Sequence, residues 1–176
     1  MKYCAFLRGV NVNGTSMKMA EVCKVFSDKE MKNVSSVLAS GNILFSSDKN
    51  VSELKQILEK AMSEYFNYEA FIFIKNEKEI SEMFQGNPFT KTENSHTYIF
   101  IGINEIEKIL FEEFHNASKT ENEKAKIVAN TFYWQIPKGN TLASTFGKIL
   151  GKKSLKDKIT SRNINTFEKI IKQFKK

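Results

Sequence analysis

The sequence predicts an α+β protein in which a ferredoxin-like βαββαβ half is packed on a second, related α+β half. Three observations favour this fold class. Strand-like and helix-like segments alternate along the 176 residues, a similar order of segments occurs in both halves, and the 15 Phe residues are spread along the chain. A chain of this length can bury about 70% of its unfolded surface. A core of ordinary size is therefore available.

The first half, residues 1–75, contains four predicted strands and two predicted helices. Residues 2–8 alternate as a strand. Residues 34–39 and 43–46 are rich in β-formers and are separated by Gly and Asn, which tolerate the positive φ of a hairpin. Residues 69–74 form the last strand of the βαββαβ order. Two apolar helical stripes lie between these strands: Met19, Val22, Cys23 and Phe26, then Leu54, Ile57, Leu58, Ala61, Met62 and Tyr65.

The second half, residues 76–176, is also mixed. A short helix around Ile80 precedes the break Gly86-Asn87-Pro88, and a strand is expected from His96 to Ile101. A helix follows, with an apolar stripe that includes Ile106 and Leu110. The remaining expected segments are strands at 125–129 and 131–136, a helix near 141–150 and a final helix.

Four of the expected helix starts share Asn followed three residues later by Glu, which is the pattern of a capping box. The pairs are Asn50 with Glu53, Asn76 with Glu79, Asn104 with Glu107, and Asn165 with Glu168. Similar caps and a similar element order indicate a distant duplication, although no repeat at a fixed period is found.

Composition excludes several classes of protein. No stretch approaches the roughly 20 apolar residues of a membrane span, and the N-terminal apolar run is too short for a signal peptide, so we expect a cytoplasmic protein. Cys4 and Cys23 are expected to be reduced core residues, because their spacing fits neither a disulfide framework nor a metal site. His96 and His115 are interpreted as surface or strand-end residues. No metal and no cofactor are predicted.

Positive charge is concentrated near the C-terminus. Residues 138–176 contain 11 Lys or Arg against Asp157 and Glu168, a net charge of +9, whereas the rest of the chain carries −2. Such clustering favours an anionic partner, and a lysine-rich solvated surface is the alternative. The lysines proposed to contact nucleic acid are Lys148, Lys152, Lys153, Lys156 and Lys158.

Arginine is rare in this basic chain. Of 27 basic residues, Arg8 and Arg162 alone are arginine. The guanidinium group binds phosphate or carboxylate with two parallel hydrogen bonds, which an ammonium group cannot do. Both residues are therefore candidate anion ligands, and we expect them to share one cleft. The alternative is that each clamps backbone carbonyls or a buried carboxylate.

Two polar segments could hold an anion. In the first, Gly9 and Gly14 have the glycine spacing of a P-loop, but Thr15 stands where the P-loop lysine would be, which argues against nucleotide triphosphate hydrolysis. Backbone amides there could still cradle an anion, or the glycines could serve a tight turn before a helix capped by Thr15 or Ser16. The second segment, residues 160–166, is expected at a helix start, where polar side chains suit either anion binding or plain capping.

The chain resembles domain of unknown function family 1697, a bacterial family. The resemblance is carried by Phe6-Leu7-Arg8-Gly9-Val10-Asn11-Val12, Ser40-Gly41-Asn42-Ile43-Leu44-Phe45, Asn87-Pro88-Phe89 and Ser161-Arg162-Asn163-Ile164-Asn165-Thr166. It departs from the family where Asn13 replaces a frequent Gly and Ile164 replaces a frequent Trp. The resemblance implies a bacterial origin, an α+β fold in two related halves and no established activity.

The leading hypothesis is a non-catalytic module that binds a phosphate-bearing ligand, either nucleic acid or a nucleotide. Its predicted anion ligands are Arg8, Gly9, Asn11, Ser40, Asn42, Ser161, Arg162, Asn163 and Asn165. The alternative is a small-molecule enzyme in which the arginines orient an anionic substrate while Ser40, Asn42 or Ser161 supplies polar groups. A protein-interaction domain is a third possibility, and the oligomeric state stays open. The strand aromatics Tyr3, Phe6 and Phe45 are similar to those of RNA-recognition modules, whose open sheets stack bases, but neither strand fits the consensus of that module and the second half could bury the sheet face.

Overall fold

The computed structural model describes residues 1–10 and 17–176, which form two compact units. The first unit comprises Met1–Ser81 and Glu168–Lys176, and the second comprises Glu82–Phe167. Six α-helices and two four-stranded antiparallel sheets are present within the described residues. The α+β class predicted from the sequence is confirmed.

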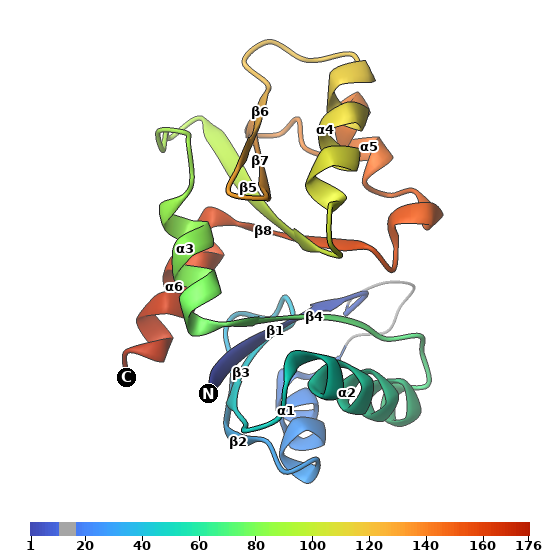
Figure 1. Cartoon of the computed structure of the whole chain (residues 1–176). Coiled ribbons are helices and arrows are strands. Elements are labelled where there is room, and N and C mark those ends of the chain that lie inside the picture. The colour runs from blue at the N-terminus through green and yellow to red at the C-terminus, as the bar shows by residue number, and fades with distance from the viewer. Residues whose placement is uncertain (11–16) are drawn as a thin grey trace. The chain divides into compact units, whose positions relative to one another are not determined.

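The first unit has the expected βαββαβ order, followed by a third helix (Figure 1). Its elements are β1 (Lys2–Arg8), α1 (Met19–Asp28), β2 (Lys32–Ser36), β3 (Asn42–Ser46), α2 (Val51–Phe66), β4 (Phe71–Asn76) and the beginning of α3 (Glu77–Gln85). The strand order in the sheet is β2-β3-β1-β4, and every neighbouring pair is antiparallel. The long connections therefore carry α1 and α2 over one face of the sheet.

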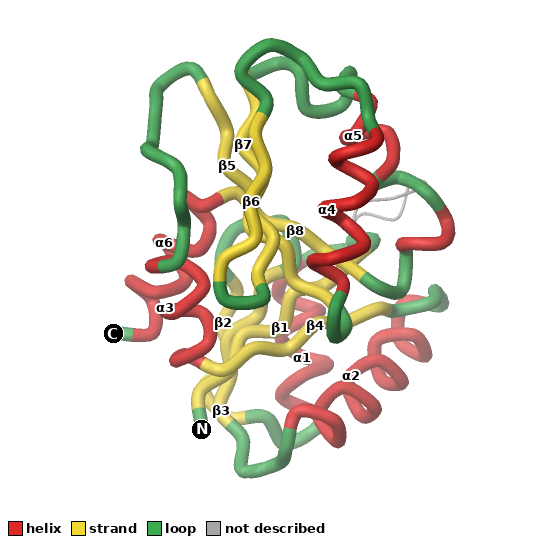
Figure 2. The backbone as a smooth tube through the Cα atoms, turned by 45° about the horizontal axis from the view of Figure 1, so that its top comes forward, coloured by secondary structure: helices red, strands yellow, loops and turns green. Residues whose placement is uncertain are grey.

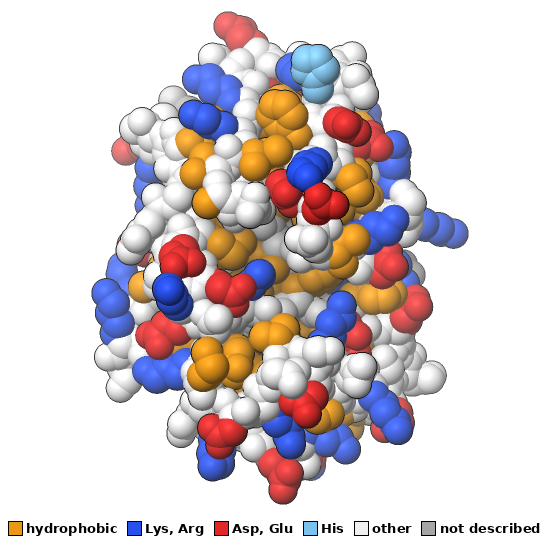
Figure 3. All heavy atoms as spheres, viewed as in Figure 1, with side chains coloured by type: hydrophobic (Ala, Val, Ile, Leu, Met, Phe, Trp, Pro, Cys, Tyr) orange, Lys and Arg blue, Asp and Glu red, His pale blue; other side chains and the backbone are white. Residues whose placement is uncertain are grey.

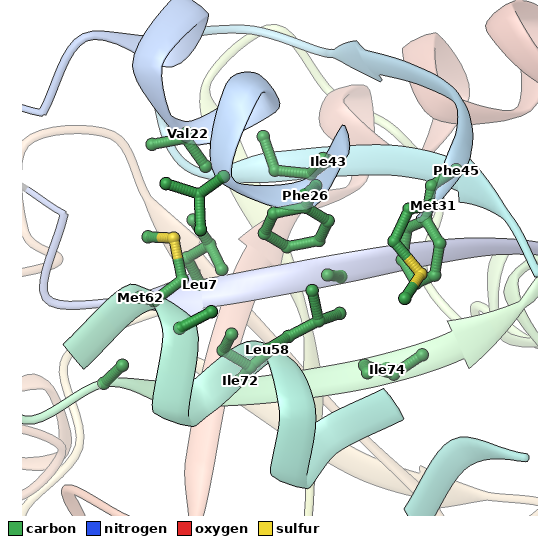
Figure 4. Packing of buried hydrophobic residues seen from close by; sticks show 14 of the residues in the cluster. Leu7, Val22, Phe26, Met31, Ile43, Phe45, Leu58, Met62, Ile72 and Ile74 are labelled. Carbon is green, nitrogen blue, oxygen red and sulfur yellow. The ribbon is translucent and has the colours of Figure 1, made fainter. Parts of the chain in front are cut away.

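The core of the first unit lies between α1, α2 and that face of the sheet (Figures 2 and 4). Phe26 of α1 and Leu58 of α2 are fully buried and meet strand residues such as Ile43 and Ile72. Burying a side chain of this size contributes roughly 1.5–3 kcal/mol. Most residues of the apolar stripes predicted for these helices are thus explained by one shared core, whereas Tyr65, which was predicted on the second stripe, is 52% exposed.

The second unit repeats the arrangement. Its elements are the end of α3, then β5 (Ser95–Gly102), α4 (Ile106–Asn116), β6 (Lys124–Val128), β7 (Thr131–Pro137), α5 (Thr145–Ile149), a 3₁₀ helix η1 (Lys153–Leu155), β8 (Ile159–Asn163) and the beginning of α6 (Ile164–Phe174). The strand order is β6-β7-β5-β8, again antiparallel throughout. Both units therefore place their first strand between the third and the fourth.

Equivalent positions in the two sheets hold similar residues. Tyr3 pairs with Asn76 of the fourth strand in the first unit, and Tyr98 pairs with Asn163 in the second. On its other side each Tyr faces an aromatic residue: the ring centroids of Tyr3 and Phe45 are 5.6 Å apart, and those of Tyr98 and Trp134 are 5.5 Å apart. These pairs form a residue-level correspondence between the units.

Strand β8 was not predicted. We expected a helix start across residues 160–166, whereas Ile159–Asn163 is a strand paired with β5, and α6 begins at Ile164. The polar residues of this segment lie on a five-residue edge strand, where hydrogen bonding to β5 outweighs their low intrinsic strand preference.

Two of the four expected helix caps are confirmed. Asn50 and Asn76 each accept a hydrogen bond from the backbone N–H of the Glu three residues later, and each Glu accepts one in return. The other two are wrong. The residue before α4 is Glu105, which makes no side-chain cap, and Asn165 lies inside α6.

Candidate functional site

The predicted ligand residues of the first unit lie at the end of β1. Arg8 is half-buried opposite Phe71, and Gly9 follows with φ of +79°, a conformation that favours glycine. Tyr68 approaches Gly9, and its hydroxyl is buried without a hydrogen-bond partner among the described residues. Burial, with a smaller contribution from Glu59, raises the pKa of Tyr68 to about 12. Asn11 lies outside the residues that the structure describes.

Ser40 and Asn42 belong to the β2–β3 hairpin. Asn42 is fully buried, and its Nδ2 donates to Val37 O at 2.8 Å and to Ser40 Oγ at 3.0 Å. Gly41 between them has φ of +74°, and a Cβ there would lie 2.5 Å from Val10 Cγ2. These contacts give Asn42 a structural role in closing the hairpin, and its ligand role stays a prediction.

The aromatic residues Tyr3 and Phe45 are not on an open sheet face. Both belong to the core beneath α1 and α2, with exposed fractions of 3% and 2%. A base could not stack on these rings without unfolding that core. The comparison with RNA-recognition sheets therefore fails for this pair.

Arg162 lies on β8 with its guanidinium close to its own strand. Nη1 donates to Thr160 Oγ1 at 2.7 Å and to Ser161 O at 2.8 Å. Arg8 belongs to the first unit and Arg162 to the second, so the expectation that they share a cleft stays a prediction. Ser161 is half-buried on the same strand.

A hollow of about 690 Å³, lined mostly by polar residues, lies at the end of the second sheet where β5 begins and where β7 and β8 finish. We call it the α6 hollow, because Ile164 and Asn165 at the start of α6 line it. Helix α6 follows β8 directly (Figure 1). Two residues predicted as ligands, Asn163 and Asn165, line it together with His96 and Lys138. The remaining lining residues are Lys91, Thr92, Glu93, Asn94, Ser95, Thr97 and Ile164.

Hydrogen bonds fix the orientation of the Asn163 amide and the tautomer of His96. Asn163 Oδ1 accepts from the backbone N–H of Asn165 at 3.0 Å, so this atom must be the amide oxygen. Asn163 Nδ2, which can only donate, lies 3.1 Å from His96 Nδ1. Nδ1 must therefore accept, and the proton of the neutral imidazole resides on Nε2. His96, which lines the hollow, thus carries a hydrogen-bond donor at Nε2.

The equivalent position of the first unit shows what is special about this helix start. There Glu79 forms the cap with Asn76, and its carboxylate gives the start of α3 a negative charge of its own. The same carboxylate also pairs with Lys75 at 2.8 Å. Counting from Asn163, the position of Glu79 is taken by Thr166, and the first turn of α6 contains no acidic residue. The first turn of α6 therefore supplies no negative charge of its own to the positive end of the helix.

The lysines proposed for nucleic acid lie elsewhere in the second unit, on α5, on η1 and beside them. Lys148, Lys152, Lys153 and Lys156 are exposed, and Lys158 is half-buried. Lys152 Nζ lies 3.5 Å from Glu113 Oε2, which offsets part of its charge. On the face shown in Figure 3, Lys and Arg side chains are interspersed with Asp and Glu.

The described part of the chain shows no cluster of three or more His, Cys, Asp or Glu side chains arranged to hold a metal ion. It also contains no helix both long and apolar enough to cross a bilayer. Cys4 is buried and Cys23 half-buried, and both are free thiols. The chemistry available in the α6 hollow is thus that of ammonium, imidazole, amide, hydroxyl and carboxylate groups.

The model of the family described as "Protein of unknown function (DUF1697)" matches residues 1–133. The chain belongs to this family. The DUF1697 match covers β1 to β7 up to Tyr133, so β8 and α6 lie beyond it. A solved structure of the conserved bacterial protein SP0830 from Streptococcus pneumoniae is similar with a TM-score of 0.79 and 20% identity, over 99% of this chain and 98% of that chain. This likeness shows the fold. No curated protein matches the chain.

Proposed function

We propose that the protein binds a phosphate-bearing ligand in the α6 hollow. The observation that carries the proposal is the convergence of two ammonium groups, Lys91 and Lys138, and the His96 Nε2–H donor at a helix start without an acidic residue. Helix N-termini and lysines attract phosphate, and a neutral imidazole adds a directional bond. Asn163 holds the imidazole in its donor tautomer.

The proposal is for binding and not for catalysis. A general base needs a free lone pair within reach of the proton that it removes. His96 Nδ1 already accepts from Asn163, and Nε2 carries the proton, so the imidazole of the free protein has no lone pair to offer. This supports the leading hypothesis from the sequence, a non-catalytic binding module, over the alternative of a small-molecule enzyme.

We also assign each unit to the ferredoxin-like fold. The assignment is supported by the βαββαβ order and by strand orders that place the first strand beside the third and the fourth. Fold alone carries no function, so the proposal depends on the hollow.

Titration with inorganic pyrophosphate, followed by the fluorescence of the single Trp134, tests the proposal. Trp134 lies in the core of the second unit beside Tyr98 and reports on that unit. In a double variant that carries Lys138→Gln and His96→Gln, the affinity for pyrophosphate is expected to fall at least tenfold, because each hydrogen bond to a charged group contributes about 1.5–3 kcal/mol. Lys124→Gln, an exposed lysine of β6 outside the lining, is the matched control. Equal affinity in all variants would reject the site.

Nucleic acid is a second candidate ligand, favoured by the lysines of α5 and η1. If it binds there, replacing Lys152, Lys153 and Lys156 with Gln lowers the salt slope of binding by about 0.7–0.9 for each phosphate that is no longer neutralised. The change Arg162→Lys lowers affinity at constant charge if the guanidinium contacts phosphate. Anisotropy titrations with single-stranded RNA at two salt concentrations measure both effects. An unchanged slope would exclude this surface.

A further inference from the structure

We infer that the ligand of the α6 hollow is a phosphorylated sugar or polyol, a molecule that joins a phosphate to adjacent hydroxyl groups. The inference rests on the proposed function and names the class of ligand. Three properties of the hollow lead to it: its size, its one carboxylate, and a lining rich in amide and hydroxyl side chains that contains no Phe, Tyr or Trp among the described residues.

The size of the hollow exceeds what a phosphate needs. Its volume of about 690 Å³ lies within the roughly 300–1,000 Å³ typical of sites for whole small molecules. The cations and His96 account for one part of the lining, which leaves the remainder to contact the rest of the ligand. The ligand must therefore carry a sizeable group beside its phosphate.

The carboxylate of Glu93 specifies the chemistry of that group. Of the described residues that line the hollow, Glu93 alone is acidic, and it forms no hydrogen bond or ion pair with the described residues. A carboxylate accepts hydrogen bonds and repels phosphate oxygens. It therefore fits a ligand that also presents donors, and neighbouring hydroxyl groups are donors of this kind. The same pairing of carboxylate and ribose hydroxyls occurs in dinucleotide sites.

Amide and hydroxyl side chains make up most of the remaining lining. Asn94 and Asn165 are exposed, and their side-chain amides have no partner within the part of the chain that is described. Each amide both donates and accepts, which matches a hydroxyl group in either role. Thr97, by contrast, is already engaged through Gln135 Nε2 at 3.1 Å. The two Asn residues and Glu93 are therefore the groups available to a sugar.

The lining also argues against recognition of a nucleobase. Phe, Tyr and Trp are absent from the described residues around the hollow, where His96 supplies the one ring. Proteins that hold a base usually stack it on such side chains, which contribute about 1–3 kcal/mol per base. A saturated sugar ring needs no such platform.

Calorimetric titration with ribose 5-phosphate, n-propyl phosphate and inorganic phosphate tests the inference. We expect ribose 5-phosphate to bind at least tenfold more tightly than n-propyl phosphate, which has the same phosphate ester without hydroxyl groups. In the Glu93→Ala variant this ratio is expected to fall about tenfold, the effect of one charged hydrogen bond, while affinity for n-propyl phosphate stays equal or rises. Glu121→Ala, at an exposed position of the same unit outside the lining, is the matched control.

The results separate the inference from the proposed function. Equal affinity for ribose 5-phosphate and n-propyl phosphate would overturn the inference and leave phosphate binding intact. A ratio that survives Glu93→Ala would also overturn it, because the hydroxyl groups would then be bound elsewhere. Binding of none of the three phosphates would overturn both proposals. Thermal unfolding of each variant verifies that the fold is retained.

Discussion

Replacing Asn163 with Asp is expected to move a proton within His96. In the native chain the amide Nδ2 lies 3.1 Å from His96 Nδ1 and forces that nitrogen to accept. Asp has the shape of Asn, and it keeps the hydrogen bond from the Asn165 N–H, which is 3.0 Å long in the native chain. It differs in placing an oxygen, instead of the amide nitrogen, against His96 Nδ1. Two acceptors then face each other, unless the imidazole proton moves from Nε2 to Nδ1.

The size of the change in the tautomer ratio follows from the hydrogen bond that forms when the proton moves to Nδ1. An N–H donor facing a carboxylate contributes about 1.5–3 kcal/mol, and about 1.4 kcal/mol corresponds to a factor of ten. The Nδ1–H form of the neutral imidazole should therefore change from the minor to the major form, by a factor of about ten or more. Phosphate binding should weaken in parallel, because Nε2 no longer donates and a negative charge has been added. Asn163→Ala, which removes both bonds, should lower the free energy of unfolding by about 2 kcal/mol.

Long-range ¹⁵N–¹H correlation spectra at alkaline pH identify which ring nitrogen carries the proton. The chain has two histidines, so a His115→Asn variant assigns the signals of His96. The reasoning is refuted if native His96 is already an Nδ1–H tautomer, or if Asn163→Asp leaves the Nε2–H form dominant. Either result would mean that Asn163 does not control the donor.

Three further predictions concern stability, each measured by chemical denaturation. Gly41→Ala should lower the free energy of unfolding by at least about 2 kcal/mol, because Gly41 has a positive φ and an added Cβ would overlap Val10. Gly151→Ala is the control: the nearest neighbour of an added Cβ is an oxygen 3.4 Å away, so the loss should be under about 1 kcal/mol. Equal losses in the two variants would contradict the argument from backbone strain. Ala129, with φ of 46° in the two-residue β6–β7 turn, should gain about 0.5–1 kcal/mol on change to Asn, which tolerates that conformation. Tyr68→Phe should add about 1 kcal/mol by removing a buried hydroxyl without a partner among the described residues. Because the pKa of Tyr68 is raised to about 12, the native chain should lose stability from about pH 10 upward through pH 12 as the unfolded chain ionises first. Tyr68→Phe should show a smaller loss, and the remainder is expected because burial also raises the pKa of Tyr133.

Periodicity predicted most of the fold because most elements bury one face. The stripes of α1 and α2 and the alternation of β1 follow directly from the core that they share. Strand β8 escaped prediction because three of its five residues, Ser161, Arg162 and Asn163, are polar and half-buried. The strand forms because it pairs with β5, about 60 residues earlier in the chain. The local sequence pattern of residues 159–163 does not indicate a pairing partner so distant in the sequence.

The lining of the α6 hollow was predicted in part, for a related reason. Asn163 and Asn165 were singled out from their polar setting, and both line the hollow, whereas their ligand role stays a prediction. His96 and Lys91 also line it and were not singled out, because nothing near them in sequence suggests a site. They reach the hollow because β5 begins beside the end of β8. The register Tyr98–Asn163 was the missing information, and it is a property of the sheet.

The two units together explain why a site would arise at α6 and not at α3. The corresponding pairs are separated by 95 residues for Tyr3 and Tyr98 but by 87 for Asn76 and Asn163, so a search at a fixed period cannot detect the repeat. The strand register alone aligns them, and the alignment shows one difference at the helix start: Glu79 closes the cap of α3, whereas Thr166 stands at that position in α6 and the first turn of α6 carries no acidic residue. The change Thr166→Glu should therefore bring a carboxylate to the start of α6 and weaken phosphate binding. Because Thr166 is 7% exposed, the gain from a rebuilt cap on Asn163 is offset by the cost of placing a larger, charged side chain there. Fluorescence titration with pyrophosphate, beside denaturation of the same variant, measures both effects. A variant that folds and binds pyrophosphate as tightly as the native chain would show that the ligand does not use this helix end.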